Sequence, residues 1–362
     1  MKVAVGLSGG VDSSVAALML KDAGHEVVGV TMKLWREGRY QGGTRDACFG
    51  AGEELDIAQA AALAERLGIE YRVLDCADAY ERDVLDYFRE TSLAGRTPNP
   101  CVFCNARMKF GLLPRLAREG GLDFEAFATG HYARIVRRDG RFAVQRAADE
   151  GKDQSYFLYR LSQEQLAHTL FPLGGLTKQE VRAYARAHGL DMADKPDSQD
   201  FYSGDRNELI GVEDREGEVV DLAGRVLGRH RGYWHYTIGQ RKGLGIAAPE
   251  PLYVVRVDAC RNQVVLGGKE ALSVRSFRVD EMNWMAQAET DAPIDCSVKI
   301  RSTGAPRGPA TFQGGVCTVP DGIAGVAPGQ SAVFYDADGV ILCGGVIGVQ
   351  GDAQGGDERR ET

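Results

Sequence analysis

The sequence predicts an α/β domain with a doubly wound parallel sheet, followed by two small β domains. Near the start, an apolar strand pattern passes through Ser8-Gly9-Gly10 into a helix rich in Ala and Leu. Strand and helix patterns then alternate, which is typical of a parallel sheet covered on both faces. Beyond about residue 205 the pattern changes to short strands separated by glycine turns. With 362 residues, 44% of them apolar and 26% charged, the chain is long enough for two or three globular domains.

The first domain is assigned to residues 1–205. A strand pattern follows the first helix, and a polar, glycine-rich stretch from Arg36 to Gly52 comes next. Apolar spacing then predicts further alternating elements: a helix at 53–67, a strand at 71–74, a helix at about 79–93 and a strand at 124–129. Thr177 and Glu180 form a capping-box pattern that opens a helix ending near Gly189. In such a domain the ligand lies at the carboxyl ends of the strands.

The rest of the chain is divided into a central β domain at 206–274, a C-terminal β-barrel at 275–350 and a polar tail at 351–362. Strand patterns in these parts lie at 253–257, 264–266, 297–300 and 332–335. The last of them is followed by Asp338-Gly339, a step that favours a hairpin. The C-terminal half is therefore expected to be built from strands alone.

Cysteine content and charge restrict the class of protein. No apolar run is long enough for a secretory signal or a membrane span. Eight cysteines, two of them spaced Cys101-Val102-Phe103-Cys104, suit metal or redox chemistry in a reducing compartment better than a disulfide framework. We therefore expect a cytoplasmic protein with no membrane association. The net charge of −8 argues against indiscriminate nucleic-acid binding but leaves room for a local basic face.

The hexapeptide Ser8-Gly9-Gly10-Val11-Asp12-Ser13 predicts a pyrophosphate-binding loop. Glycines let the backbone approach phosphate oxygens, and the following helix presents N–H groups and the positive end of its dipole. Asp12 can hold Mg²⁺ or polarise a nucleophile. Because no Gly-Lys-Ser/Thr follows, the expected chemistry is cleavage of ATP between the α and β phosphates with transfer of AMP. A simple strand-to-helix turn is the alternative, but the full hexapeptide between a strand and a helix favours the phosphate-binding loop.

The Cys101–Cys104 pair lies in a segment from Gly95 to Asn105 whose prolines, Pro98 and Pro100, stiffen the backbone. The spacing is compatible with buried apolar thiols, with a dithiol that cycles through a disulfide or persulfide, and with two ligands of a metal centre. A phosphate-binding loop in the same domain favours the two reactive interpretations.

Together these motifs resemble the tRNA-specific 2-thiouridylase family, a branch of the PP-loop ATP pyrophosphatases. Further segments carry the resemblance: Ala128-Thr129-Gly130-His131-Tyr132-Ala133-Arg134, Lys152-Asp153-Gln154-Ser155-Tyr156-Phe157-Leu158, Lys195-Pro196-Asp197-Ser198-Gln199 and Tyr236-Thr237-Ile238-Gly239-Gln240-Arg241-Lys242-Gly243-Leu244-Gly245. The resemblance implies adenylation of the C2 oxygen of the wobble uridine, position 34 in the anticodon stem-loop, followed by its replacement with sulfur. The products would be 2-thiouridine, AMP and pyrophosphate, and Mg²⁺ would accompany ATP.

The resemblance also implies roles for single residues. ATP would be bound by Gly6, Leu7, Ser8, Gly9, Gly10, Val11, Asp12, Ser13, Met32 and Gly130. Asn99, Pro100 and Cys101 would lie beside the target base, and tRNA would be contacted by His131, Lys152, Asp153, Gln154, Arg301, Ser302 and Gln330. A cysteine desulfurase, a sulfur-relay protein or sulfide would donate the sulfur. Cys104 matches the first catalytic cysteine of the family.

Two departures from the family pattern change the expected sulfur chemistry. Cys101 stands where the family usually has an acidic residue, and Tyr202 stands where its second catalytic cysteine is expected. Tyrosine cannot carry a persulfide. Either Cys101 and Cys104 form the redox pair themselves, or they hold a [4Fe–4S] cluster with Cys48 as third ligand. We favour the cluster; Cys76 is the second choice for that ligand, and zinc stays open. The other cysteines, Cys260, Cys296, Cys317 and Cys343, are interpreted as core residues.

Two stretches mix basic and aromatic residues, as RNA-binding surfaces do. One contains Arg134, Arg137, Arg138, Arg141 and Arg146; the other contains Arg225, Arg229, His230, Arg231, Tyr233, Trp234, Arg241 and Lys242. Each could equally be a solvated charged edge. A small-molecule ligase of the ATP pyrophosphatase type would share the phosphate loop but would need no paired thiols. A non-catalytic RNA-binding module would not need Asp12 and Ser13.

Overall fold

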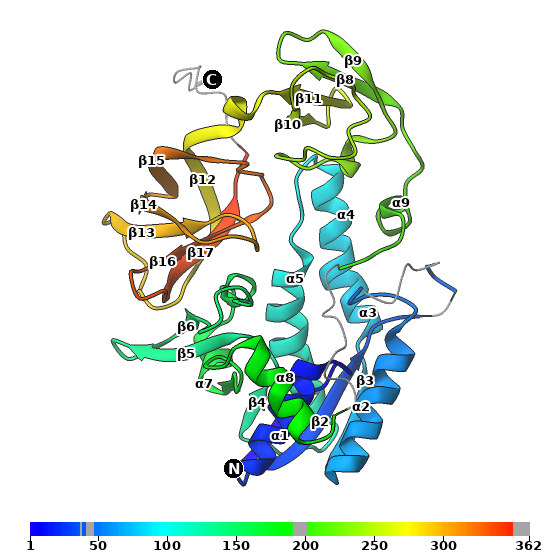
Figure 1. The fold of residues 1–362 in the computed structure, drawn as a ribbon, viewed down its shortest axis with the longest axis vertical. Helices are drawn as coiled ribbons and strands as arrows, with labels where there is room; N and C mark the ends of the chain where they lie inside the picture. The colour runs from blue at the N-terminus through cyan, green and yellow to red at the C-terminus, as the bar shows by residue number, and fades with distance from the viewer. Residues whose placement is uncertain (37, 41–46, 191–200, 350–362) are drawn as a thin grey trace, which may run out of the picture.

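The computed structural model describes residues 1–36, 38–40, 47–190 and 201–349. In Figure 1 the parallel sheet and its helices lie at the bottom, the barrel at the left and the central β domain at the top. The expected polar tail at 351–362 and the segment from Lys195 to Gln199, with Asp197, lie outside the described residues.

The first domain is built on a five-stranded sheet in which every neighbouring pair of strands is parallel. In sheet order the strands are β3 (Glu70–Asp75), β2 (Glu26–Lys33), β1 (Lys2–Gly6), β4 (Ala126–Ala128) and β7 (Thr169–Leu170). Val3, Ala4 and Val5 of the central strand are fully buried, because both faces of the sheet are covered.

Helices pack on both faces of this sheet. One face is covered by α1 (Val11–Asp22), α2 (Glu53–Leu67) and α8 (Lys178–Ala187), which share an apolar cluster with Val3 and Val5. The other face packs against a continuous helix made of α5 (Pro100–Phe103), a π-helical segment (Cys104–Leu112) and α6 (Leu113–Glu119). The expected doubly wound fold is confirmed. The helix expected at about 79–93 is also present, as α3 (Ala77–Tyr80), a π-helical turn (Glu81–Leu85) and α4 (Asp86–Leu93).

A hairpin and several short elements follow the fourth strand. The hairpin consists of β5 (Ala133–Arg138) and β6 (Arg141–Arg146), and it precedes a 3₁₀ turn (Ser155–Leu158) and α7 (Gln163–Ala167). Arg138 forms ion pairs with Asp336 and Asp338 of the barrel, and Arg141 donates to the carbonyl oxygens of Trp284 and Met285. The hairpin therefore docks the first domain onto the C-terminal barrel.

The central domain begins with α9 (Arg206–Ile210) and contains a four-stranded mixed sheet. Its strands are β8 (Gly217–Asp221), β9 (Val226–His230), β10 (Tyr253–Asp258) and β11 (Gln263–Gly267), in the order β10-β11-β8-β9. Short 3₁₀ turns lie at Tyr233–His235 and Lys269–Leu272. The Tyr233 hydroxyl donates to the carbonyl oxygen of Leu93, 2.7 Å away, so this domain is joined to the end of α4.

The C-terminal domain is a closed six-stranded antiparallel barrel. Its strands are β12 (Ser273–Trp284), β13 (Ile294–Lys299), β14 (Arg307–Gln313), β15 (Val316–Ala324), β16 (Ser331–Tyr335) and β17 (Ile341–Ile347). Phe277, Phe312 and Phe334 fill its interior. The expected Asp338-Gly339 hairpin joins β16 to β17, and Gly339 has a φ of 73° that favours glycine.

Three of the four cysteines expected in the core pack with the barrel interior, namely Cys296, Cys317 and Cys343. The expectation for Cys260 is wrong, because that residue is exposed in the turn between β10 and β11. Every helix within the described ranges is too short or too polar to cross a lipid bilayer.

Candidate active site

The phosphate loop connects β1 to α1 and is fixed by short hydrogen bonds. The N–H of Leu7 donates to the carbonyl oxygen of Val30 (2.9 Å), and the Thr31 hydroxyl donates to that of Leu7 (2.7 Å). The Ser13 hydroxyl oxygen lies 3.2 Å from both the backbone nitrogen and the hydroxyl of Ser8. Gly10, at the helix N-cap, has no side chain between the first turn of α1 and a ligand. This geometry suits a polyphosphate.

Two glycines are required by close packing at this loop. Gly9 has a φ of +68°, and a Cβ there would lie 2.5 Å from the carbonyl oxygen of Asp56 on α2. A Cβ on Gly130 would lie 2.6 Å from the carbonyl carbon of Asp12 and from the nitrogen of Ser13. Gly130 therefore packs against the phosphate loop, at the carboxyl end of the sheet where Met32 also lies.

Asp12 is held by two residues that sequence reasoning missed. The Lys178 ammonium donates to both carboxylate oxygens of Asp12, each at 2.8 Å, and the Tyr132 hydroxyl donates to one of them at 2.9 Å. Lys178 is only 6% exposed and is the first residue of α8. The capping box that places it was visible in the sequence, but its contact with Asp12 was not.

A carboxylate together with ATP oxygens is the kind of ligand set that Mg²⁺ prefers, so Asp12 fits the expected metal ion by its chemistry. Lys178 already contacts both of its oxygens. Asp12 would hold the metal ion, which would supply positive charge beside the phosphates of bound ATP.

The two cysteines of the CxxC pair lie in the first turns of the helix that begins at Pro100. Both are half-buried. Burial, followed by the Cys48 and Cys104 thiols, raises the pKa of Cys101 to about 12, and Lys109 opposes this shift. Burial raises the pKa of Cys104 to about 11, again opposed by Lys109. The thiols are therefore mostly protonated at neutral pH, and Lys109 is the cation that favours their reactive thiolate form.

Cys48 and Cys76 lie in the same neighbourhood but do not complete a metal site. Cys48 is exposed, yet its thiol is near enough to raise the pKa of Cys101 and of Cys104. Cys76 is buried, and burial raises its pKa to about 12. Across the described ranges, no three Cys, His, Asp or Glu side chains converge to hold a metal ion. The arrangement therefore does not support the expected [4Fe–4S] site on Cys48, Cys101 and Cys104.

Tyr202, at the position expected for the second catalytic cysteine, packs beside the segment that carries Cys48. The N–H of Phe49 donates to the carbonyl oxygen of Phe201 (3.1 Å), and the rings of Phe49 and Tyr202 are 6.2 Å apart. The Tyr202 hydroxyl donates to the carboxylate of Glu208. Tyrosine thus has a packing role here.

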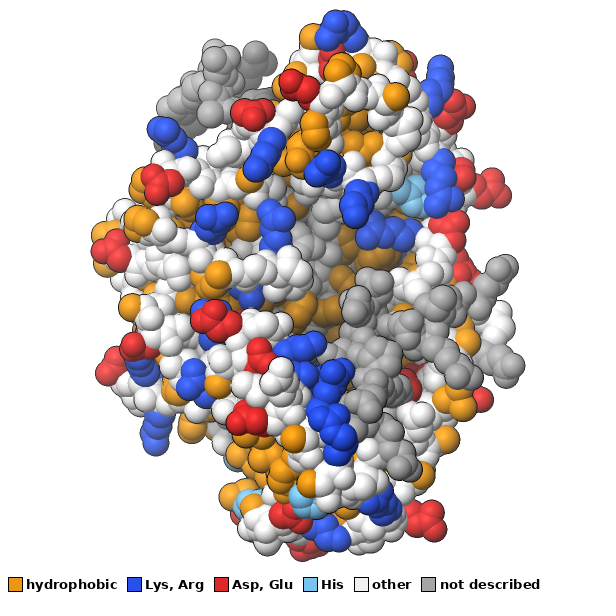
Figure 2. Space-filling view, viewed as in Figure 1, with side chains coloured by type: hydrophobic (Ala, Val, Ile, Leu, Met, Phe, Trp, Pro, Cys, Tyr) orange, Lys and Arg blue, Asp and Glu red, His pale blue; other side chains and the backbone are white. Residues whose placement is uncertain are grey.

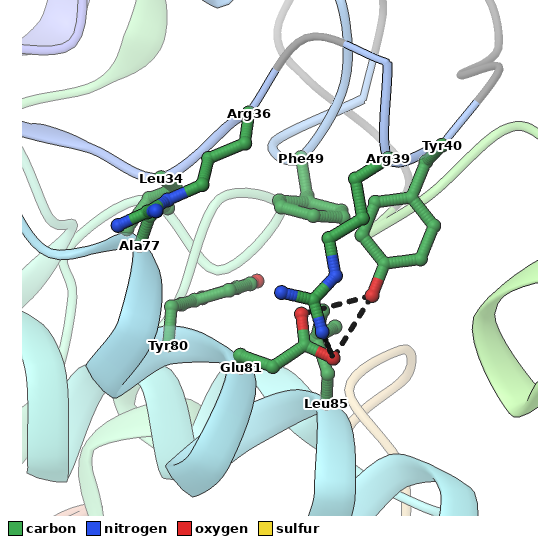
Figure 3. Close-up of a pocket in the computed structure, with 9 residues that line it drawn as sticks. All are labelled: Leu34, Arg36, Arg39, Tyr40, Phe49, Ala77, Tyr80, Glu81 and Leu85. Atoms are coloured by element: carbon green, nitrogen blue, oxygen red, sulfur yellow. Dashed lines mark hydrogen bonds and ion pairs between the residues drawn. The ribbon is translucent and has the colours of Figure 1, made fainter.

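The same segment borders the small pocket of Figure 3. The pocket is lined by Leu34, Arg36, Arg39, Tyr40, Phe49, Ala77, Tyr80, Glu81 and Leu85. Arg39 and the Tyr40 hydroxyl both contact the Glu81 carboxylate, and the Phe49 ring stacks on Tyr80 at 5.2 Å. These contacts anchor the chain that brings Cys48 toward the CxxC pair.

The thiols and the phosphate loop lie at one end of the molecule's parallel sheet. Met32 and Cys104 pack against the same apolar cluster, which contains Cys76, Tyr80 and Met108. Burial, and then Lys109, hold the pKa of His131 well below its usual range. Lys109 therefore acts both on the cysteine thiols and on His131, the residue after Gly130, so the cysteine pair and the Gly130 segment lie near the same cation.

The residues expected at tRNA are not all on the surface. Arg301 and Ser302 are exposed, while Pro100, Asn99, His131 and Asp153 are buried and Lys152, Gln154 and Gln330 are half-buried. The side chain of Asp153 is 0% exposed and pairs with Lys299 (3.4 Å) and Arg146 (3.6 Å). Nδ1 of His131 lies 2.7 Å from the Thr129 hydroxyl. Gln154 accepts from the N–H of Tyr132 at 2.9 Å.

The two basic stretches differ in their contacts and exposure. Arg138 and Arg141 of the first contact the barrel, whereas in the second Arg225, Arg229, Arg231, Arg241 and Lys242 are exposed. Figure 2 shows Lys and Arg side chains gathered around the recess between the barrel, the central domain and the first domain. This face suits a polyanion more than the net charge suggests.

Comparisons with known proteins place the whole chain in one family. Three family models match in order: a tRNA methyl transferase HUP domain at residues 1–202, a tRNA methyl transferase PRC-barrel domain at 209–268 and an aminomethyltransferase β-barrel domain at 274–347. The tRNA-specific 2-thiouridylase MnmA of Endomicrobium trichonymphae is 44% identical over 96% of this chain and 99% of its own length. That of Methylobacterium radiotolerans is 46% identical over 96% of this chain and 93% of its own length.

The chain belongs to the tRNA-specific 2-thiouridylase family. This membership confirms the resemblance drawn from the motifs and does not favour the small-molecule ligase. As a member of this family the protein is a sulfurtransferase that uses ATP through its PP-loop domain.

Proposed function

We propose that the protein catalyses ATP-dependent 2-thiolation of the wobble uridine, position 34, in the anticodon stem-loop of tRNA. The products are 2-thiouridine, AMP and pyrophosphate. The observation that carries the proposal is the link between the cysteine pair and the phosphate loop. Gly130 packs against Asp12 and Ser13, and Lys109 acts on both Cys104 and His131, the residue after Gly130. Family membership supplies the substrate class.

In the first step, the uridine C2 oxygen attacks the α-phosphate of ATP, and pyrophosphate leaves. Residues Gly6 to Ser13 hold the polyphosphate, and Met32 and Gly130 complete the nucleotide site. Adenylation turns a poor leaving group, the uracil oxygen, into a good one. Asn99, Pro100 and Cys101 lie beside the base, which must be splayed out of its stack to enter.

In the second step, sulfur is delivered from the cysteine pair. One of Cys101 and Cys104 carries a persulfide, whose terminal sulfur attacks C2 and expels AMP. The thiolate of the other cysteine then attacks the sulfur of the first, so the bond to the transferred sulfur breaks and 2-thiouridine is released. The products of this exchange are 2-thiouridine and a Cys101–Cys104 disulfide, which a dithiol reductant must reduce before the next turnover. A cysteine desulfurase or a sulfur-relay protein supplies the sulfur as a persulfide. Sulfide supplies it by a different route, in which it attacks the Cys101–Cys104 disulfide and gives the persulfide of one cysteine and the thiolate of the other, so that no separate reductant is needed.

Since the described side chains do not converge on a metal, no step is routed through an iron–sulfur cluster. An iron–sulfur cluster on the cysteines is the alternative. It is tested by measuring the iron and acid-labile sulfide content of the parent protein and of Cys101→Ala after anaerobic purification. The dithiol route predicts no stoichiometric iron, full loss of thiolation in Cys104→Ala and retained thiolation in Cys48→Ala. Bound iron together with an inactive Cys48→Ala protein would restore the cluster on Cys48, Cys101 and Cys104.

For tRNA we propose contacts from His131, Lys152, Asp153, Gln154, Arg301 and Ser302. Gln330, which the resemblance also places at tRNA, uses its side-chain amide to contact the carbonyl oxygens of Thr97 and Pro98 instead. The exposed Arg301 and Ser302 support direct contact, whereas the buried Asp153 supports an indirect contribution through the residues around it. A tRNA substrate and a need for reduced thiols fit a cytoplasmic location.

The activity is tested by incubating protein, ATP, Mg²⁺, a persulfide donor, a dithiol reductant and tRNA. Release of AMP that depends on tRNA, together with 2-thiouridine in digested tRNA by mass spectrometry, is the expected result. AMP release that depends on a small metabolite instead would indicate a ligase, and no AMP release under either condition would indicate a non-catalytic binder.

A further inference from the structure

The segment from Gly95 to Cys101 is the place where all three domains meet. A Cβ on Gly95 would lie 3.0 Å from the side chain of Ala259 in the central domain. Two residues further along, the N–H of Thr97 donates to the carbonyl oxygen of Pro328 in the barrel, 2.8 Å away. The chain that leads to the reactive cysteines is therefore packed between the two β domains.

Gln330 of the barrel holds this segment through its side-chain amide. Its Nε2 donates to the carbonyl oxygen of Pro98 at 2.8 Å and to that of Thr97 at 3.3 Å. The backbone of Gln330 is itself fixed, because its N–H donates to Ala327 (3.1 Å) and its carbonyl accepts from Ile347 (2.8 Å). The amide thus connects a rigid part of the barrel to the cysteine segment.

The residues on either side of Gln330 add to the same contact. Gly329 has a φ of +90°, and a Cβ there would lie 2.8 Å from the carbonyl oxygen of Thr97. Ser331 lies on the other side, where its hydroxyl is 3.4 Å from the amide nitrogen of Asn99 and its carbonyl accepts from Tyr156 at 3.1 Å. Residues 329–331 therefore enclose the segment from Thr97 to Asn99, immediately before Pro100 and Cys101.

We propose that Gln330, with Gly329 and Ser331, is a positioning element that sets the conformation of the cysteine segment, so that the C-terminal barrel controls the exposure of Cys101. A barrel that shifts when tRNA docks moves the Thr97–Asn99 backbone with it, because the Gln330 amide donates to backbone carbonyls of this segment and the Thr97 N–H donates to the barrel backbone at Pro328. Pro98 and Pro100 transmit the movement, since they leave few backbone rotations between the barrel contact and the thiol.

This assignment differs from direct tRNA contact by Gln330, and the two have different consequences. A direct contact would affect the affinity for tRNA alone. A positioning role affects the reactivity of Cys101 even when no tRNA or ATP is present. The inference therefore does not depend on which substrate is thiolated, although its value for catalysis rests on the proposed function.

The test replaces Gln330 with Met, which has a similar length but no donor. The rate of alkylation of Cys101 and Cys104 by iodoacetamide is measured for the full chain by peptide mass spectrometry. We expect Cys101 to react about tenfold faster, because a net hydrogen bond changes a local equilibrium by about this factor. In the thiolation assay kcat should fall while the Kd for tRNA stays unchanged. Gln313→Met, which removes a barrel amide that donates to Asp291 at 3.1 Å, is the matched control.

The core cysteines Cys317 and Cys343 report on folding, since they react only when the barrel opens. If Cys317 and Cys343 become labelled in Gln330→Met, that variant is partly unfolded, and the alkylation rate of Cys101 is measured in the isosteric variant Gln330→Glu instead. Unchanged alkylation of Cys101 in a folded variant, or a raised Kd for tRNA with an unchanged kcat, would overturn the proposal. Failure of the thiolation assay alone would count against the proposed function and leave the alkylation result standing.

Discussion

At the scale of single residues, the contact between Lys178 and Asp12 predicts that Lys178 is needed for the use of ATP. Lys178→Met removes the cation that contacts both carboxylate oxygens, so the negative charge of Asp12 beside the phosphate loop is no longer offset by this lysine. Because hydrogen bonds to charged groups contribute about 1.5–3 kcal/mol, we expect kcat/KM for ATP to fall about 10- to 100-fold. The measurement is tRNA-dependent AMP release at varied ATP.

Lys178→Arg keeps the charge and should lose less, while Lys269→Met removes an exposed lysine of the central domain and serves as the matched control. If Lys178→Met had the same kcat/KM for ATP as the control, the lysine would have no part in nucleotide use.

Lys109 gives a second prediction at this scale, one that concerns pH. Burial raises the pKa of Cys104 to about 11, and Lys109 opposes that shift. Removing the charge in Lys109→Met should raise this pKa further, so that less thiolate is present at any given pH. We expect the pH profile of Cys104 alkylation, measured by peptide mass spectrometry, to move to higher pH. Arg107→Met, which removes an exposed neighbouring charge, should leave the profile near its original position.

At the scale of elements, the docking of the β5–β6 region on the barrel depends on a buried charge cluster. Asp153, with a side chain that is 0% exposed, pairs with Lys299 of β13 and with Arg146 of β6. Removing Lys299 leaves Asp153 with Arg146 as an ionic partner but takes away a bond to a buried charge, so Lys299→Met should destabilise the protein by about 2 kcal/mol. Denaturant unfolding measures this loss.

The double variant Asp153→Asn with Lys299→Met removes both charges and should be less destabilised than the sum of the single variants. Strictly additive losses would mean that Lys299 and Asp153 stabilise the interface independently.

The elements also show what sequence can and cannot predict. The phosphate loop was predictable because its strand, glycines and helix are adjacent in the chain, and the alternation of strands and helices gave the doubly wound sheet. The contacts that these elements make with residues far away in the sequence were not predictable. Lys178 meets Asp12 across 166 residues, and Gln330 meets Pro98 across 232. No local periodicity encodes such contacts, because they depend on how separate domains pack.

The cysteines illustrate the same limit at the candidate site. The sequence predicted a pair of thiols on a segment stiffened by Pro98 and Pro100. It did not predict that a helix would begin at Pro100 and carry both cysteines in its first turns. Whether Cys48 would complete a metal site depended on the path of the loop after β2, and the described side chains do not converge. The exposure of Cys260 was missed for a related reason, since a strand-like pattern does not reveal where its turn begins.

At the scale of the whole molecule, the local basic face must act against a net charge of −8. Figure 2 shows that face around the recess between the domains, and Arg241 and Lys242 are exposed on the central domain. Binding of tRNA releases counterions from its phosphates, so affinity should fall steeply as salt rises. We expect Lys242→Ala to weaken binding and to reduce the slope of log K against log salt by about 1, the value for one lost phosphate contact.

Filter binding of tRNA between low and moderate salt measures the slope. Arg115→Ala is the matched control, because Arg115 is exposed on α6 of the first domain and pairs with Glu119 at 3.2 Å. Its slope should equal that of the parent. An affinity for tRNA that does not depend on salt, or equal slopes for the parent and Lys242→Ala, would mean that this face does not bind the tRNA backbone. In that case the substrate would have to be held by shape and base contacts near the cysteine segment, and the exposed basic residues of the central domain would serve only as a solvated edge.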